Sequence, residues 1–172
     1  MNRELKIEPL SRDGFSAFGD VIEMEGSRHF PINNGATERF HDTARVFAQA
    51  TEGYASISLA RSQPLPSPLR IRMLERHPLG SQAFIPQDQR PFVVVVAPAG
   101  EQIDAGSIRA FVSNGRQGVN YHPGVWHHSL LALSADQDFV LVDLITAESN
   151  CDEYWFDDER QLTLDYAGLL QA

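Results

Sequence analysis

The chain has 172 residues, of which 42% are hydrophobic and 22% are charged, as expected for one globular domain with its own core. Its 14 basic and 23 acidic residues give a formal net charge of −9, which argues against nucleic acid or an anionic membrane as a partner. The N-terminus lacks the pattern of a signal peptide, and the longest apolar run, Phe92–Pro98, is too short to span a membrane. We therefore expect a cytoplasmic protein.

The kinds of basic residue and the single cysteine exclude several chemistries. Thirteen of the basic residues are arginines and only Lys6 is a lysine, so the body of the chain offers no lysine for a Schiff base or a phosphate loop. An anionic ligand must then be held by arginine, through two parallel hydrogen bonds. Cys151 stands alone, which excludes an internal disulfide and a thiolate zinc cluster, and its acidic neighbours make it a poor nucleophile.

Helical patterns are confined to the two ends of the chain. Ser11 is a candidate N-cap for a short helix that runs through Phe18 and ends at Gly19, and Asp165–Leu170 suits one or two terminal turns. Between them, short apolar or alternating segments are separated by turn residues, a pattern typical of strands. In chain order the predicted strands are Tyr54–Ala60, Leu69–Leu74, Phe92–Ala97, Ile108–Val112, Val125–Leu133 and Phe139–Ile145.

Many short strands without intervening helices indicate an all-β barrel or sandwich. The one linker-like segment, Gln63–Pro68, is rich in proline, and we interpret it as an extended crossover. The 62 residues before it would make a poor core alone. We therefore expect residues 1–172 to form a single domain, with an N-terminal arm packed on the outside of the barrel.

Three of the six histidines lie within seven residues, around a Pro-Gly turn: His122, His127 and His128. Imidazole transfers protons near neutral pH and is the commonest metal ligand. If a strand resumes after the turn, His127 and Ser129 share one face and His128 lies on the other. We expect one face of this hairpin to look into a cavity, although three surface histidines beside a turn would give the same pattern.

A second polar cluster contains Glu75, His77 and Gln82. Glu75 and His77 are two residues apart, so they share a face of a strand, and Gln82 can return to that face after a turn at Gly80. Together with His122 and His127 these side chains could line one barrel interior. A carboxylate, an amide and imidazoles can hold a divalent cation, and the alternative is a purely organic pocket.

The two clusters resemble the two motifs of the cupin superfamily. Glu75-x-His77-x4-Gln82 occupies the first motif, which has two histidines and a glutamate, and His122–His127 occupies the second, with His122 at the proline position. The match is degenerate, because one histidine has become glutamate and the glutamate has become glutamine. The resemblance implies a cupin-like β-barrel of jelly-roll type and a metal set of Glu75, His77, Gln82 and His127.

A more specific resemblance covers most of the chain. It rests on segments of the sequence that occur in this order: 29–35, 38–42, 75–80, 82–86, 92–97, 118–122 and 125–128. Together they resemble the ureidoglycolate lyase family of bacterial allantoin degradation. The resemblance implies a cupin-like barrel, usually a homodimer, that splits ureidoglycolate into glyoxylate and urea. It also implies a divalent metal, nickel in particular with zinc as the alternative, and no organic cofactor.

The residues suit that chemistry, since cleavage of a carbinolamide needs a base for its hydroxyl proton, an acid for the departing urea, and groups that hold the carboxylate. The catalytic candidates are Glu75, His77, His122 and His127. Arg39 is the first candidate for the carboxylate because it follows the Asn33-Asn34-Gly35 loop and shares a strand face with His41. The substrate-binding candidates are Asn34, Arg39, His41, Arg61 and Tyr121, although Arg61 also suits a structural salt bridge and Tyr121 the core.

Two other functions fit a pocket of this kind. A non-catalytic cupin that binds or senses a small carboxylate would share the pocket without turnover. A metal-dependent cupin oxygenase is disfavoured, because Glu75 and Gln82 replace two of the usual ligands.

Overall fold

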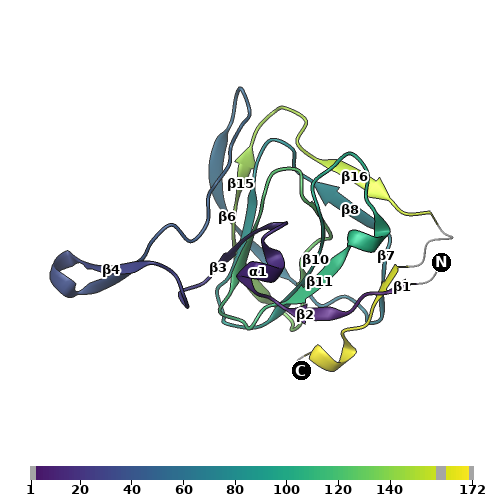
Figure 1. The fold of residues 1–172 in the computed structure, drawn as a ribbon, viewed down its shortest axis with the longest axis horizontal. Helices are drawn as coiled ribbons and strands as arrows, with labels where there is room; N and C mark the ends of the chain where they lie inside the picture. The colour runs from purple at the N-terminus through teal and green to yellow at the C-terminus, as the bar shows by residue number, and fades with distance from the viewer. Residues whose placement is uncertain (1–2, 158–161, 171–172) are drawn as a thin grey trace.

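The computed structural model describes residues 3–157 and 162–170 (Figure 1). In the first half of the chain the elements are β1 (Arg3–Glu4), β2 (Ile7–Pro9), α1 (Arg12–Phe15), β3 (Gly19–Ile22), β4 (His29–Ile32), η1 (Asn33–Gly35), β5 (Thr37–Phe40), β6 (Tyr54–Ser62), β7 (Leu69–Ile71), β8 (Met73–Arg76) and β9 (Gln82–Pro86). In the second half they are β10 (Phe92–Ala97), η2 (Ala105–Ser107), β11 (Arg109–Val112), β12 (Gly118–Tyr121), β13 (Trp126–His127), β14 (Leu131–Ala132), β15 (Gln137–Ile145), β16 (Asp152–Trp155), β17 (Leu162–Leu164) and η3 (Ala167–Leu169).

Two main sheets form the body of the protein. One has the order β16-β8-β13-β10-β11-β2, with β14 also paired to β10, and the other has the order β3-β12-β9-β15-β6. The apolar cluster between them includes Phe92 of β10 together with Tyr121 and Phe139 of the second sheet. The fold is therefore all-β, in the two-sheet form of a cupin-like barrel, as the sequence predicted.

Strand β10 is buried on both faces and separates two cores. Phe92, Val94 and Val96 point into the cluster between the main sheets. Val93, Val95 and Ala97 point to the opposite side, where β1, β17 and β7 form a third, three-stranded sheet. The continuous apolar run had indicated such a doubly buried strand. The expected N-terminal arm on the outside of the barrel is wrong in part, because β2 and β3 are edge strands of the two main sheets and β1 pairs with β17.

Two predicted strands are interrupted. Leu69–Leu74 is divided at Arg72 into β7 and β8, which belong to different sheets. Val125–Leu133 is divided into β13 and β14, both of which pair with β10 but are separated by residues 128–130. The first break allows the chain to change sheets, whereas the second leaves both parts paired with β10. The predicted N-terminal helix is also shorter, although Ser11 caps it by accepting a hydrogen bond from the backbone N–H of Gly14.

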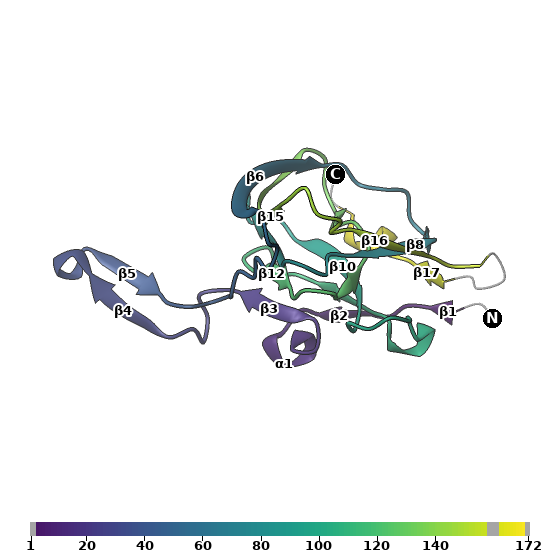
Figure 2. The ribbon, with the colours of Figure 1, turned by 90° about the horizontal axis from the view of Figure 1, so that it is seen from above.

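The most unusual feature is a hairpin, β4–β5, that projects from the body (Figures 1 and 2). The sequence analysis predicted no strand there. At its tip, Asn33 and Asn34 have φ of 53° and 55° and Gly35 has φ of 87°. Asn and Gly are the residues that adopt this left-handed region most readily, which explains the turn. None of the helices in the described residues is long and apolar enough to cross a membrane.

The core between the sheets is aromatic and gives a stability prediction. Phe139 is fully buried, with its ring centroid 5.3 Å from that of Phe92 and 6.3 Å from that of Phe84. Phe139→Ala should lower the free energy of unfolding by about 3–5 kcal/mol, because it removes buried apolar surface and leaves a cavity. Urea denaturation measures the loss. The exposed Met24 provides the control, and equal effects of Phe139→Ala and Met24→Ala would contradict this packing.

Candidate active site

Three side chains of the two predicted clusters meet where β8 pairs with β13. Glu75 of β8 lies directly opposite His127 of β13 in the antiparallel pairing of these strands. His77 follows β8, and its ring centroid is 5.2 Å from that of His127. One ligand atom from each of Glu75, His77 and His127 lies within 4.8 Å of the others. We call these three residues the triad.

Backbone carbonyls orient both imidazoles of the triad. His77 Nδ1 is 2.7 Å from the carbonyl oxygen of Asn150, and His127 Nδ1 is 3.0 Å from that of Val125. A carbonyl only accepts, so each Nδ1 carries a proton and donates it. In the neutral ring each Nε2 then presents a lone pair, and both Nε2 atoms are buried without a hydrogen-bond partner among the described residues.

The carboxylate of Glu75 faces one of these lone pairs. Its Oε1 atom is 3.6 Å from Nε2 of His127, longer than a hydrogen bond. The interaction with His127, together with the charges of His77 and His128, holds the pKa of Glu75 below its ordinary value despite burial. A carboxylate opposite two lone pairs leaves a place for a positive group, either a proton on an imidazole or a divalent cation. The donor set therefore fits a metal.

Tyr121 of β12 covers the triad from the opposite sheet. Its ring stacks on that of His127 with centroids 4.3 Å apart and planes 13° from parallel. Burial, and secondarily the charge of Glu75, raises the pKa of Tyr121, so the phenol keeps its proton. The hydroxyl has no partner among the described residues. Tyr121 is thus both a core residue and a free hydrogen-bond donor at the site.

A cleft of about 260 Å³ opens beside His77, and its walls include Gln82, Asp143, Glu148 and Cys151. Burial raises the pKa of Asp143, partly offset by a hydrogen bond from Gln82 and by the charge of His77. Its Oδ1 atom is buried without a partner in the described part of the chain. The sequence analysis missed Asp143, although a lone carboxylate between apolar residues of β15 was a usable signal.

His122, the remaining catalytic candidate, contacts other residues than the triad. Its Nε2 atom is 3.1 Å from Oδ2 of Asp20, and its ring packs at 5.6 Å from that of Phe47. The same Asp20 oxygen accepts hydrogen bonds from Asn120 and from the backbone N–H of Arg45. His122 therefore belongs to a polar group where β3 meets β12. Its catalytic role stays a prediction.

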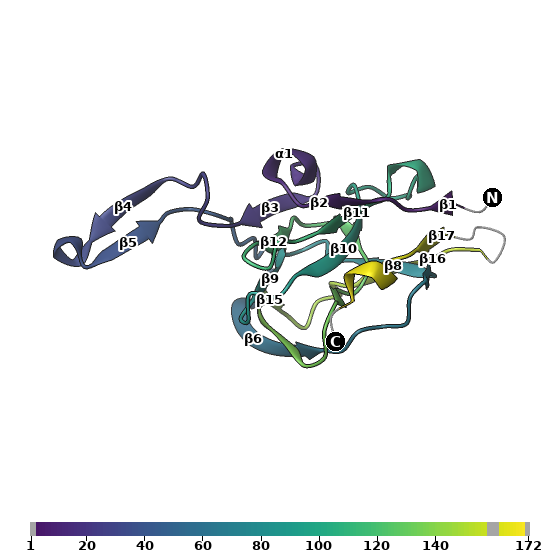
Figure 3. The same cartoon turned by 90° about the horizontal axis from the view of Figure 1, so that it is seen from below.

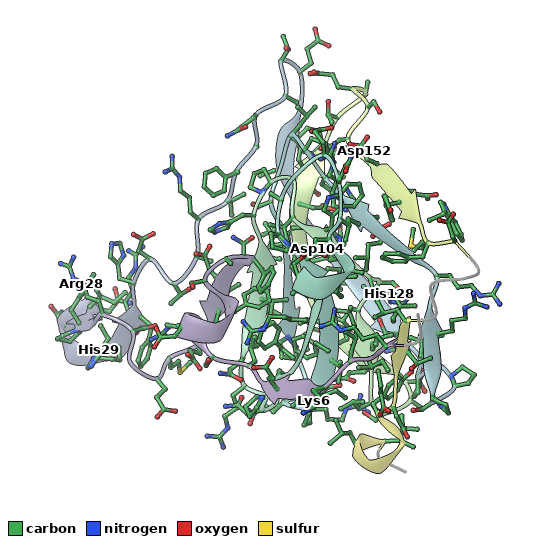
Figure 4. All side chains as sticks on the ribbon, turned by 45° about the vertical axis from the view of Figure 1, so that its right-hand side comes forward. Lys6, Arg28, His29, Asp104, His128 and Asp152 are labelled. Carbon is green, nitrogen blue, oxygen red and sulfur yellow. The ribbon has the colours of Figure 1, made fainter. Side chains whose placement is uncertain are left out.

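The other substrate-binding candidates do not lie at the cleft of their own chain. Asn34, Arg39 and His41 belong to the projecting hairpin and its base. Figure 4 shows the labelled hairpin residues Arg28 and His29 far from His128, which neighbours the triad in sequence. Arg61 forms a two-pronged ion pair with Asp138. That pair lies five residues along β15 from Asp143, a separation of about 17 Å.

Comparison with known sequences shows the family of this chain. A sequence model of the ureidoglycolate lyase family matches residues 2–163. The chain belongs to the ureidoglycolate lyase family. It is 56% identical over 163 residues to a ureidoglycolate lyase of Pseudomonas paraeruginosa, and 55% identical to one of Pseudomonas syringae pv. tomato; both alignments cover 95% of this chain and 96% of the relative. A Stutzerimonas stutzeri protein of the same name is 56% identical with the same coverage.

The raised pKa of Asp143 predicts how its charge affects stability. Between the ordinary value of 3.8 and the raised pKa of the folded state, the folded protein holds a proton on Asp143 that the unfolded chain has lost, so this residue makes stability fall as pH rises through that range. Relative to the wild type, Asp143→Asn should therefore be more stable at pH 7 than at pH 4, as measured by urea denaturation at both values.

Asp138, on the same strand, is the matched control. Its hydrogen bond with Arg61 lowers its pKa, so it contributes stability that is lost as pH falls. Asp138→Asn should therefore show the opposite change between pH 4 and pH 7. The same sign for both variants would contradict the burial of Asp143.

Proposed function

We propose that the protein is a lyase that splits ureidoglycolate into glyoxylate and urea in allantoin degradation. Its relatives carry that name, and the observation that carries the proposal is the triad. Two imidazoles with unpartnered Nε2 atoms face a carboxylate beside a cleft of suitable size for a small polar molecule. Such a site suits proton transfer, and it requires neither a covalent nucleophile nor an organic cofactor.

The reaction needs two proton movements around one carbon atom. A base removes the proton from the hydroxyl oxygen, the carbon–oxygen double bond of glyoxylate forms, and the carbon–nitrogen bond breaks. The electron pair leaves with the urea nitrogen, which takes a proton from an acid. We assign the base to Nε2 of His127, because Glu75 opposite it stabilises the imidazolium that forms. His77 lies close enough to serve as the acid in the state in which its Nε2 atom is protonated.

Two further groups suit the polar substrate. The unpartnered hydroxyl of Tyr121 is a donor for a substrate oxygen, and the unpartnered Oδ1 of Asp143 is an acceptor for a urea N–H. Gln82 holds the Asp143 carboxyl and lines the same cleft. A buried polar group without a hydrogen-bond partner destabilises the folded protein, so binding of a ligand that supplies the missing hydrogen bonds is favoured.

A divalent cation fits the donors of Glu75, His77 and His127, and the cleft beside His77 also contains Gln82. Such a cation would occupy the Nε2 lone pairs of both imidazoles, so it is an alternative to proton transfer by these two rings. When bound, such a cation would chelate the carboxylate and hydroxyl of the substrate and lower the pKa of the hydroxyl. Nickel is the metal that we propose, with zinc as the alternative. We also propose a cytoplasmic homodimer, on the basis of the resemblance to the family.

Replacing the imidazoles tests the function directly. His77→Ala and His127→Ala should each lower turnover of ureidoglycolate by about 100-fold or more, the loss typical of a general acid, base or metal-holding group. Coupled assays for glyoxylate and urea measure the rate. His29→Ala is the matched control, because this exposed histidine pairs with Glu38 on the projecting hairpin. Saturable binding of ureidoglycolate without products by the wild type would instead favour a non-catalytic binding protein.

The metal is tested by its retention as well as by activity. Elemental analysis of purified protein should find about one divalent ion per chain, and His77→Ala or His127→Ala should lose it. His122→Ala, which lies outside the triad, should keep it. Removal by a chelator should abolish activity, and readdition of nickel or zinc should restore it. Full activity of protein shown to be metal-free would overturn this part of the proposal.

A further inference from the structure

The projecting hairpin, residues 28–41, forms few contacts with the body of its own chain. We call it the arm. The substantial contacts of β4 and β5 are with each other and with η1, and the arm extends away from both main sheets (Figures 2 and 3). A two-stranded hairpin is marginally stable in water unless it packs against another surface. We therefore expect the arm to pack against another surface.

The two faces of the arm differ in chemistry. Phe30 pairs with Arg39 and Ile32 pairs with Thr37, so these four side chains share one face. His41 joins that face, with its ring centroid 5.5 Å from that of Phe30. The opposite face carries the ion pair between His29 and Glu38. Arg39 is exposed and forms no ion pair within the described residues, so the first face combines apolar surface with a free cation.

The cleft of the barrel has the complementary surface. Its described lining includes the acids Asp143 and Glu148 and contains neither arginine nor lysine. Ile145 lies between Leu144 and Thr146 of this lining and pairs with Tyr54 of β6, and we call these two residues, with 42% and 64% of their surface exposed, the rim of the cleft. Ile145 lies two residues from Asp143 and so shares its face of the sheet. The rim is thus apolar and lies next to acidic groups. The described lining of the cleft offers an anionic substrate no arginine or lysine to bind its carboxylate.

We propose that the arm seats on a second copy of this chain and places Arg39 at that copy's cleft. The chain that leaves the base of the arm runs past the cleft, since the backbone N–H of Phe47 donates to Ser81 and Ala48 bridges to Gly80. In a two-fold dimer, arms that begin beside one cleft reach the other reciprocally. Phe30 and Ile32 cover the apolar rim, and the guanidinium of Arg39 faces the acidic cleft.

This arrangement completes the active site of the proposed lyase. The catalytic part of the inference rests on that proposed function. A guanidinium binds a carboxylate through two parallel hydrogen bonds. The partner's Arg39 therefore binds the substrate carboxylate, and each chain alone holds only the proton-transfer groups. Arg39→Ala should lower kcat/KM by about 10- to 100-fold, mainly through KM, as expected for loss of a charged hydrogen bond. Arg116→Ala removes another exposed arginine and should change neither value.

Dimers that combine two different variants show whether Arg39 serves the cleft of the partner chain or the cleft of its own chain. Arg39→Ala keeps its triad and loses the arginine, whereas His127→Ala keeps the arginine and loses the triad. Co-expression should restore about a quarter of wild-type activity, because half of randomly paired dimers contain both variants and each of those has one complete site. If Arg39 served its own cleft, the mixture would stay at the mean of the two variants, and the proposal would be overturned.

The seating of the arm is tested without any assay of activity. The backbone N–H of His41 donates to the carbonyl of Arg28, so Asn-Gly can replace residues 29–40 as a two-residue hairpin loop. The shortened chain should sediment as a monomer while the wild type sediments as a dimer, and thermal unfolding should show that it is folded. A shortened chain that remains dimeric would overturn the proposal. If the wild type lacks lyase activity, the proposed function fails, and sedimentation still decides the role of the arm.

Discussion

The pairing of Glu75 with His127 across β8 and β13 is the constraint on which the site depends. β13 is only two residues long and lies between β8 and β10, so both neighbours determine its register. A shift of one residue would turn His127 towards the outer core and Trp126 towards the carboxylate. Trp126 packs in the core on the side of the three-stranded sheet, with the guanidinium of Arg76 4.7 Å from its ring. This packing therefore also keeps His127 pointing towards Glu75.

The doubly buried strand β10 supports this pairing. One of its faces packs on the second main sheet and the other on the three-stranded sheet, so β10 cannot shift without disturbing both apolar cores. Tyr121 then closes the site from the second sheet, because its ring stacks on His127. The unpartnered polar atoms around the triad cost stability, and the two cores around them offset that cost. This is the expected balance at a site that binds a polar ligand.

Charge is distributed unevenly over the molecule. The acids of the cleft and the net charge of −9 would repel an anionic substrate, so a cation must be supplied close to the triad. Arginines on the body that face acids, such as Arg61 with Asp138 and Arg109 with Glu8, are already occupied by ion pairs. Arg39 lies on a face without such a partner in the described chain, and this is the cation that the proposed seating of the arm would bring to the cleft.

Local patterns were sufficient for much of this protein. The alternation of Glu75 and His77, the Pro-Gly turn before His127 and the continuous apolar run of β10 each report a strand or turn that depends on neighbouring residues alone. The order of the motifs also predicted the family. Tertiary structure decided which candidates meet: it brought Asp143 and Tyr121 to the triad, and left His122 with Asp20 and Arg61 with Asp138. It also placed Arg39 on the arm, away from the body of the protein. Pairing between strands that are far apart in the sequence sets these positions. The spacing of residues within one segment does not determine which distant strand pairs with that segment.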